Sequence, residues 1–474
     1  MSDAAGQPGI DPDRLETCVE VLREIGTLPL DHPDATRIRR ATADLFKTMK
    51  LLRRKARRES DALITASTAT AAPGRIDDET LGRPLTVPTD GGSSVGELHH
   101  PRACYICKQR YRDVHHFYHQ LCPDCAAFSW AKREARTDLA GRRALLTGGR
   151  AKIGMYIALR LLRDGAHTTI TTRFPADAVR RFSAMPDSAD WLHRLRIVGV
   201  DLRDPRQVVA LADDVAAQGP LDILINNAAQ TVRRSPGSYS HLVNAESTPL
   251  PDGPRPDVLV LGQPTHEHPL ELGTHAFDAD ELTALSLTSG SSSLERVAAN
   301  TAIDAGGLVP DLATSNSWTH KVDEVDALEL LEVQLCNVTA PFILVSRLRA
   351  AMAASSYRRK YVVNVSAIEG RFNRGYKGPG HPHTNMAKAA LNMLTRTSSE
   401  EMLLTDGILM TAVDTGWITD ERPHPTKARL HVEGFRAPLD LVDGAARVYD
   451  PVVRGEAGED LFGCFLKDYQ PSAW

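Results

Sequence analysis

The sequence predicts an α/β protein built on a parallel sheet, preceded by an α-helical region and a small metal-binding finger. Short β-branched runs alternate with amphipathic helical stretches from Arg142 onward, which is typical of βαβ units. Four of the seven cysteines form two tight pairs, and the N-terminal region has helical periodicity. The 474 residues are enough for about two or three folded units with a large core.

The composition excludes several classes of protein. With 56 Lys+Arg, 60 Asp+Glu and a net charge of −4, the chain is neither wholly disordered nor uniformly basic like a nucleic-acid coat. No run approaches the roughly 18 apolar residues of a membrane span, and the N-terminus has neither the basic nor the apolar region of a signal peptide. We therefore expect a cytoplasmic protein that does not enter a membrane.

Residues 1–62 are predicted to form a helical region with a strongly basic second helix. A short helix is expected over residues 11–26 and a longer one over residues 36–60. Residues 37–58 contain ten Lys or Arg and one acidic residue, a local net charge of +9. This stretch could be the solvated face of a helical hairpin or a surface through which the chain associates with itself, and we expect a homo-oligomer. Alternatively, it could contact a protein or nucleic-acid partner.

The two cysteine pairs predict a zinc site in a finger at residues 99–137, after a flexible linker at residues 63–98. The pairs are Cys-x-x-Cys motifs separated by fourteen residues, and four thiolates suit tetrahedral zinc. The expected ligands are Cys104, Cys107, Cys122 and Cys125. Because four thiolates fill the coordination sphere, no position remains for a catalytic water, and the zinc is expected to be structural.

The second cysteine pair opens a helix expected at residues 126–135, which is the arrangement of a treble-clef finger. His115, His116 and His119 lie between the two pairs, and any one of them could replace a cysteine as ligand. The simpler interpretation is that these histidines lie on the surface of a hairpin.

A glycine-rich turn follows the first strand of the α/β region, which is expected over residues 138–474. The turn, TGGRAKIG at residues 147–154, opens a helix, and in this context backbone N–H groups bind a pyrophosphate. Four further features follow in order: Asp201 after the third strand, Asn226 to Ala229 after the fourth, Asn337 in a helix, and Ser366 at a strand end with Lys388 downstream. Residues 231–321 lack periodicity and are expected to be an insertion that forms a lid or pocket wall.

This ordered series resembles the short-chain dehydrogenase/reductase family from Arg142 to the C-terminus, apart from the insertion. The resemblance implies a Rossmann-type doubly wound parallel sheet, a bound nicotinamide dinucleotide and hydride transfer to or from a small-molecule carbonyl, alcohol or activated alkene. The positions that the resemblance assigns to dinucleotide binding are Thr147, Gly148, Arg150, Lys152, Ile153, Gly154, Arg173, Asp201, Leu202, Asn227, Ala228, Lys388, Thr415, Gly416 and Ile418.

The end of the second strand bears on the choice between NADP and NAD. The strand ends Thr171-Thr172-Arg173, without the acidic residue that would hold a ribose 2′-hydroxyl. Arg173 and Arg150 favour a 2′-phosphate instead, so NADP is expected, with NAD as the alternative. Arg173 could equally be a surface residue just past the strand. Lys152 replaces the middle glycine of the turn. Its side chain would either hinder the close approach of a phosphate to the backbone or bind the phosphate through its ammonium group.

The catalytic pattern of the family is incomplete in this chain. In the family a Ser orients the substrate, a Tyr four residues before a Lys moves the proton, the Lys lowers the pKa of that Tyr, and an Asn completes a relay. Ser366, Lys388 and Asn337 match these roles, but Thr384 stands in place of the tyrosine. Because a threonine hydroxyl does not ionise near neutral pH, Thr384 could hydrogen-bond a carbonyl or the ribose but could not act as the acid.

Three neighbouring residues could supply the proton instead: Tyr376, His381 and His383. His381 lies seven residues before Lys388, the offset at which divergent enoyl reductases of this family carry their tyrosine, and imidazole titrates near neutrality. In the alternative interpretation both histidines are loop residues beside Pro382.

Two hypotheses of function follow. The first is an NADP-dependent oxidoreductase of the short-chain dehydrogenase/reductase type with a proton donor outside the family pattern. The second is a catalytically silent NAD(P)-binding sensor or scaffold whose zinc finger and basic helix bind a protein or nucleic-acid partner. In a variant of the first, residues 1–135 serve to oligomerise the enzyme.

Overall fold

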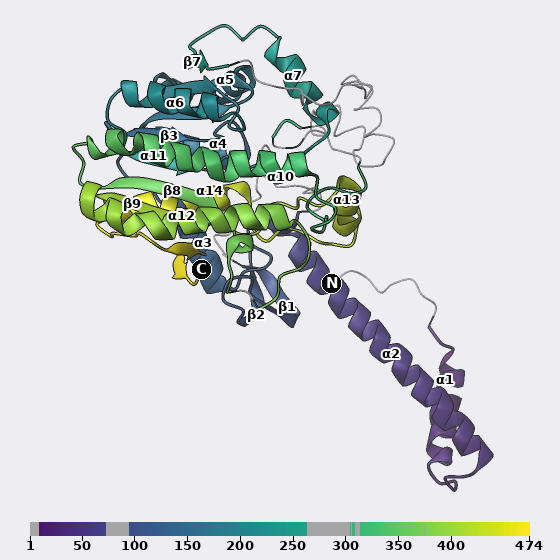
Figure 1. The fold of residues 1–474 in the computed structure, drawn as a ribbon. Coiled ribbons are helices and arrows are strands. Elements are labelled where there is room, and N and C mark those ends of the chain that lie inside the picture. The colour runs from purple at the N-terminus through teal and green to yellow at the C-terminus, as the bar shows by residue number, and fades with distance from the viewer. Residues whose placement is uncertain (1–8, 73–93, 263–303, 305, 309–312, 374) are drawn as a thin grey trace.

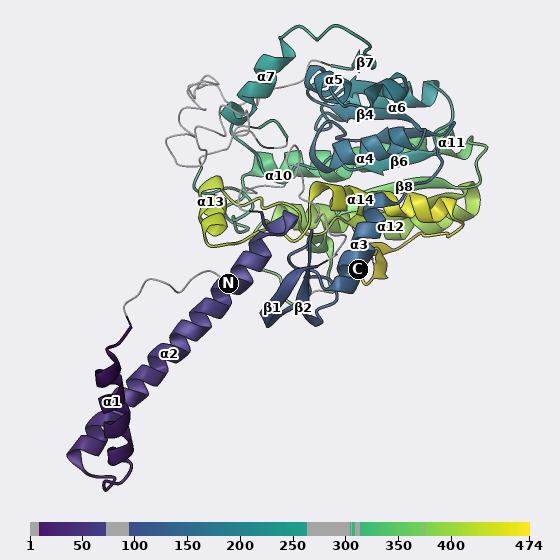
Figure 2. The same ribbon diagram turned by 180° about the vertical axis from the view of Figure 1, so that it is seen from behind.

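The computed structural model describes residues 9–72, 94–262, 304, 306–308, 313–373 and 375–474. An α/β body carries a small two-stranded finger, and one long helix projects away from both (Figure 1). The view from behind shows the same helix clear of the body along most of its length (Figure 2).

A nine-stranded sheet forms the centre of the body, and its strand order defines the fold. From edge to edge the order is β11, β10, β9, β8, β6, β3, β4, β5, β7, with all neighbours parallel except β10 and β11. The chain runs outward from β3 through β4 to β5 and then returns past β3 to β6, so the sheet is doubly wound, as predicted. The strands are β3 (Arg143–Leu146), β4 (His167–Thr172), β5 (Leu195–Gly199), β6 (Ile223–Asn226), β7 (Asp257–Val260), β8 (Lys360–Ser366), β9 (Ile408–Asp414), β10 (Phe465–Lys467) and β11 (Gln470–Ser472).

Helices cover both faces of this sheet, so the central strands are buried on both sides. β3, β5, β6 and β9 are mainly apolar, whereas β4 contains four buried threonines. One apolar layer joins the sheet to α4, α5 and α14, and the other joins it to α6, α11 and α12. These helices are α4 (Lys152–Arg163), α5 (Pro175–Ser183), α6 (Pro205–Ala217), α11 (Ala340–Ala353), α12 (Pro382–Asp406) and α14 (Leu441–Glu456). A short helix, α13 (His424–Val432), lies outside these layers.

A π-helical turn (Leu335–Thr339) joins α10 (Ala327–Gln334) to α11 and makes one continuous apolar helix. By length and composition this helix could cross a membrane, although half of its most apolar window is buried in the protein. Leu344 and Leu348 are fully buried in the layer that contains α6. The helix therefore packs here as a core element of the α/β body.

Part of the expected insertion at residues 231–321 belongs to the sheet. β7 pairs in parallel with β5 and forms the edge of the sheet, so the stretch expected to be a lid or pocket wall also contributes an edge strand. Four residues are too few for a periodic signal. The short helix α7 (Ser240–Glu246) contacts α5, and the Glu246 carboxylate accepts the backbone N–H groups of Ala176 and Asp177. Residues 263–303 of the insertion lie outside the described residues.

The N-terminal region is a helical hairpin. α1 (Pro12–Ile25) folds back along the far end of α2 (Pro33–Ala66), which has 34 residues (Figure 1). The predicted linker at residues 63–98 is wrong at both ends, because α2 continues to Ala66 and a strand begins at Ser94. Residues 73–93 lie outside the described residues. The base of α2 is fixed by buried Asp61, whose carboxylate accepts the backbone N–H groups of His99 and His100.

The finger consists of β1 (Ser94–Ala103), β2 (Arg110–His115) and α3 (Pro123–Glu134), and it packs against α14. Arg133 lies 2.5 Å from Asp440 and 3.2 Å from Asp443, and the Tyr118 hydroxyl donates to Asp443. These groups are buried, so the finger shares a polar and apolar interface with the α/β body. The prediction that the finger histidines lie on the surface is wrong for His115 and His119, which are buried.

Candidate functional site

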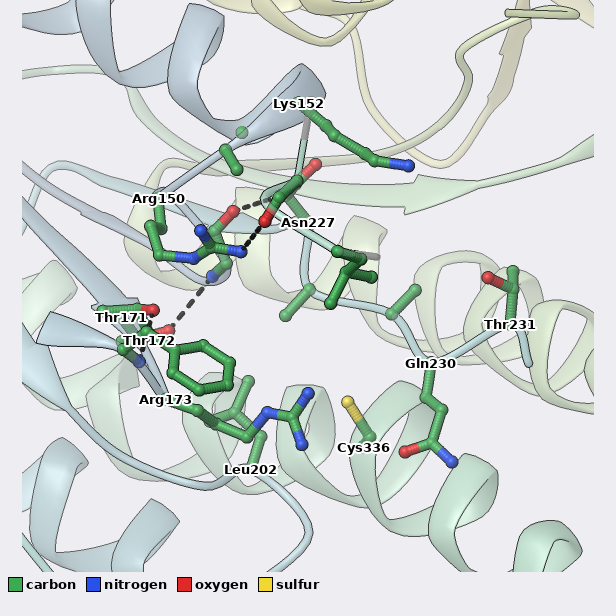
Figure 3. Close-up of a pocket in the computed structure, with 18 of the residues that line it drawn as sticks. Arg150, Lys152, Thr171, Thr172, Arg173, Leu202, Asn227, Gln230, Thr231 and Cys336 are labelled. Atoms are coloured by element: carbon green, nitrogen blue, oxygen red, sulfur yellow. Dashed lines mark hydrogen bonds between the residues drawn. The ribbon is translucent and has the colours of Figure 1, made fainter. Parts of the chain in front are cut away.

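A cleft of about 400 Å³ opens at the carboxyl ends of β3, β4, β5 and β6 (Figure 3). This is the point where the chain reverses direction across the sheet, the usual ligand position in doubly wound folds. Its lining includes Gly148, Arg150, Lys152, Ile153, Gly154, Arg173, Asp201, Leu202, Asn227 and Ala228, which are ten of the fifteen residues expected to bind a dinucleotide.

The glycine-rich turn is held in place by the segment that follows β6. The Thr147 hydroxyl accepts the backbone N–H groups of Asn227 and Ala228, each at 3.0 Å. The Asn227 amide donates in turn to the carbonyls of Thr147 and Gly148. Gly148 has a φ of 68°, and a Cβ at Gly154 would lie 2.0 Å from the Gly148 carbonyl oxygen. Both positions therefore require glycine.

Two cations of the turn are paired with the protein's own carboxylates. The Lys152 Nζ lies 3.1 Å from Asp304, and Arg150 pairs with Asp177 and donates to the Gly306 carbonyl. Burial would raise the pKa of Asp304, but Lys152 and Arg234 outweigh it and lower that pKa to about 2. The end of the insertion thus lies against the turn, and Arg150 is engaged by protein groups instead of facing an open phosphate position.

Arg173, directly after β4, points its guanidinium into the cleft toward Cys336 (Figure 3). It lies over the rings of Phe174 and Tyr239, with centroids at 5.6 and 4.9 Å. Thr172 precedes it, so no carboxylate occupies the end of this strand. The carboxylate of Asp201 is bound by Arg203 at 2.6 Å. The wall that would face the adenosine ribose is therefore cationic and aromatic.

Ser366 and Lys388 meet at the carboxyl end of β8, but each is already hydrogen-bonded. The Ser366 hydroxyl donates to Asn392 Oδ1 at 2.6 Å, and Lys388 Nζ donates to the Val365 carbonyl at 2.8 Å. Burial lowers the pKa of Lys388 to about 8. Neither Ser366 nor Lys388 is among the described residues that line the cleft, and both side chains are buried.

Asn337 lies in the π-helical turn between α10 and α11, where it positions the segment after β6. Its side-chain oxygen accepts the backbone N–H of Gln230 at 2.7 Å, and its amide donates to the Gln230 carbonyl at 2.8 Å. Such turns are common at functional sites because they aim one side chain out of the regular helix.

Thr384 and the three candidate proton donors differ in how the protein holds them. Thr384 donates to the His381 carbonyl at 2.9 Å, and Tyr376 is 76% exposed on the surface. His381, with a φ of 43°, packs against Trp318, and burial lowers its pKa to about 4. Burial also lowers the pKa of His383, whose ring lies 4.0 Å from Glu329. Both imidazoles are therefore neutral at pH 7 and hold no readily transferable proton.

Several residues of this region were not predicted from the sequence. Arg234 and Glu421 form an ion pair of 3.4 Å at the cleft, and Asn392 binds Ser366. Glu421 lies two residues after Thr419, and Asn392 lies one helical turn after Lys388. The sequence offers one signal for Glu421 and Asn392, which is that each lies close in the chain to a predicted site residue.

The four cysteines of the finger form a single cluster. Their sulfur atoms all lie within 4.8 Å of one another, and Cys107 Sγ is 3.6 Å from Cys122 Sγ. Tetrahedral zinc with Zn–S bonds of about 2.3 Å would set the sulfurs about 3.8 Å apart, so the donor set fits this ion. Within the described part of the chain, the cluster contains no histidine.

The finger also touches residues 415–419, which include three of the positions expected to bind the dinucleotide. Tyr105, between Cys104 and Cys107, accepts the backbone N–H of Trp417 at its hydroxyl, 3.0 Å away. Ile418 is buried, and Thr419 lines the cleft.

Comparisons with known proteins agree with this architecture. The short chain dehydrogenase family model matches residues 142–245. An uncharacterized protein of Acanthamoeba polyphaga mimivirus is 30% identical over 362 residues, covering 74% of this chain and 71% of its own. L-xylulose reductase of Mesocricetus auratus is 38% identical over 91 residues, 19% of this chain and 33% of that protein. The likeness to the short chain dehydrogenase family therefore extends over residues 142–245 of this chain.

Solved structures resemble the chain more distantly. A short chain dehydrogenase of Burkholderia cenocepacia in complex with NADP is 20% identical, covers 69% of this chain and 98% of its own, and has a TM-score of 0.42. A metagenomic short-chain oxidoreductase in complex with NADP is 18% identical, covers 62% of this chain and 90% of its own, and has a TM-score of 0.36.

We expect Gly154→Ala to abolish dinucleotide binding, because its methyl group would collide with the Gly148 carbonyl and push the turn apart. Gly378→Ala is the matched control, since a Cβ there meets no atom within 4 Å. Titration of NADPH fluorescence against each purified variant measures the effect. Equal affinity in the two variants would contradict the assignment of the turn.

Proposed function

We propose that the protein is an NADP-dependent oxidoreductase that transfers hydride between the nicotinamide and a carbonyl, an alcohol or an activated alkene. The observation that carries the proposal is the Arg173 guanidinium, which points into a cleft at the sheet's reversal point with no carboxylate at the end of β4. Arg173 would bind the 2′-phosphate, and the N-terminus of α4 would bind the pyrophosphate. When bound, NADP supplies or accepts the hydride.

We further propose that Lys388 holds the proton that a tyrosine supplies elsewhere in the family. Its amine, with a pKa of about 8, is partly protonated at neutral pH and is held by the carbonyl next to Ser366. Ser366 would orient the substrate oxygen after its hydroxyl leaves Asn392. Thr384, whose hydroxyl serves the His381 carbonyl, would keep the first turn of α12 in place.

A second candidate is a catalytically silent dinucleotide-binding protein. The observation that favours it is that Ser366 and Thr384 both donate their hydroxyl protons to protein acceptors and are not among the described residues that line the cleft. The two candidates share cofactor binding and differ in turnover. Oxidation of NADPH with a panel of aldehydes, ketones and enones distinguishes them.

For the finger we propose a structural zinc ion held by its four cysteine thiolates. The ion would fix the two knuckles that carry Tyr105 and the start of α3.

Arg173→Ala should weaken NADPH binding about 10- to 100-fold and leave NADH binding nearly unchanged, because a charge-assisted contact to the 2′-phosphate is lost. Dissociation constants for both cofactors, measured by fluorescence titration, test this. An equal loss for NADPH and NADH would show that Arg173 does not read the 2′-phosphate.

Turnover in the direction of carbonyl reduction should fall as the pH rises through about 8, because the protonated fraction of Lys388 falls there. Lys388→Met should lose about 10²- to 10⁴-fold in kcat, the usual contribution of a proton donor. Thr384→Val is the control and should retain most activity. A flat pH profile, or full activity of Lys388→Met, would remove Lys388 from this role.

The purified protein should contain one zinc ion per chain, and Cys122→Ser should lose it and unfold at a lower temperature. Cys18→Ser, which alters an exposed cysteine in α1, should keep both the metal and the melting temperature. Elemental analysis by mass spectrometry and thermal melting provide the readouts. Iron in place of zinc, or no metal at all, would overturn the assignment.

A further inference from the structure

The base of the projecting helix α2 and strand β1 together form a cationic surface outside the cofactor site. We define the basic patch as Lys50, Arg54, Arg57 and Arg58 of α2 with His100 and Arg102 of β1. The four helical residues are exposed, and none of the five Lys and Arg residues forms an ion pair with another described residue. Cations without protein partners are available to an external anion.

The patch converges on a cleft of about 450 Å³ between α2 and β1. Arg54 and Arg58 line it from the helix, and Arg102 lines it from the strand, two residues before the first cysteine of the finger. The single acidic residue of its lining is Asp61, whose carboxylate is occupied by two backbone N–H groups and the His100 ring. Three guanidinium groups therefore surround one concave surface.

The position of the patch around the helix points to the kind of ligand. At about 100° per residue, the basic residues of the patch lie opposite the exposed Leu45, Met49 and Leu52, while the exposed Leu51 and Phe46 lie beside them. A helix that lies on a membrane buries its apolar stripe in lipid, so the patch would then face water. A ligand that uses the patch must instead approach the polar side of α2 and β1.

The near half of α2 is the better-placed part of the arm for an anion. α1 runs along the far end and carries Asp13, Glu16, Glu20 and Glu24, which repel negative charge. From Lys50 to Arg58 the helix extends about 12 Å, the length of about three to four nucleotides along a strand. The Arg102 side of the cleft extends this cationic path onto the finger.

We propose that the basic patch binds the phosphate backbone of a nucleic acid. Several guanidinium groups on one helix and the adjoining strand match a chain of phosphates, and Arg is suited to bidentate phosphate contacts. No base-reading element is part of the patch, so binding is independent of sequence and falls steeply with salt. This site is separate from the cofactor cleft and does not depend on the proposed reaction.

The test uses the full chain and fluorescein-labelled 20-nucleotide RNA, single-stranded DNA and duplex DNA in anisotropy titrations at 20–200 mM salt. Binding should be weaker at higher salt, with a slope of log K against log salt of about −4 if four to five cations contact phosphates. The triple variant Arg54→Ala/Arg58→Ala/Arg102→Ala should lose at least about tenfold in affinity and reduce the slope by about 3.

The control variant Arg206→Ala/Arg347→Ala/Arg429→Ala removes the same charge from exposed, acid-paired arginines of the α/β body and should bind like the wild type. All variants should keep their NADPH affinity, which verifies folding. Three results would overturn the proposal: no binding at 20 mM salt, equal binding by the two triple variants, or binding to phosphatidylserine vesicles without binding to nucleic acid.

Discussion

The hydrogen bonds that tie the end of β3 to the end of β6 are the constraint on which the candidate site depends. The Thr147 hydroxyl accepts two backbone N–H groups of the segment after β6, and the strand order reverses between these two strands. The glycine turn must therefore pass close to Asn227, whose amide would lie 2.8 Å from a Cβ at Gly154. The glycine turn therefore packs directly against the segment after β6, and this close approach requires Thr147, Gly148, Gly154 and Asn227 together. The cleft opens beside this contact.

Charge balance divides the cleft into two halves with different consequences for a dinucleotide. At the turn, Lys152 is neutralised by Asp304, a carboxylate that stays ionised because its pKa is about 2. A pyrophosphate would have to compete with that carboxylate, and its net binding free energy would be the difference between the two ion pairs. Arg173 packs instead over aromatic rings, so a 2′-phosphate would displace no described carboxylate there. Under the proposed function, a 2′-phosphate would therefore meet less competition from the protein's own carboxylates than a pyrophosphate would.

The sequence predicts those parts of the fold that have local signals, and fails where partners lie far apart in the chain. The buried parallel strands and the glycine turn have such signals, and the structure contains them where they were expected. β7 was missed because its four residues become a strand only by pairing with β5. The linker was predicted to begin too early and to end too late, because Asp61 of α2 and its partners His99 and His100 of β1 lie far apart in the chain. The engagement of Ser366 by Asn392 likewise depends on packing of α12 against β8, which no single motif encodes.

Packing also explains why the finger should not be regarded as an independent module. Tyr105 stands between two of the clustered cysteines, and its hydroxyl holds the backbone of Trp417. The same finger is anchored on α14 through Arg133 and the carboxylates of Asp440 and Asp443, all buried. Removing one partner from such a buried ionic group typically costs several kcal/mol, so the finger and the segment after β9 are held in one relative position. A change in the cysteine cluster would therefore reach the backbone of Trp417 through Tyr105, although no finger residue is among the described residues that line the cleft at the glycine turn.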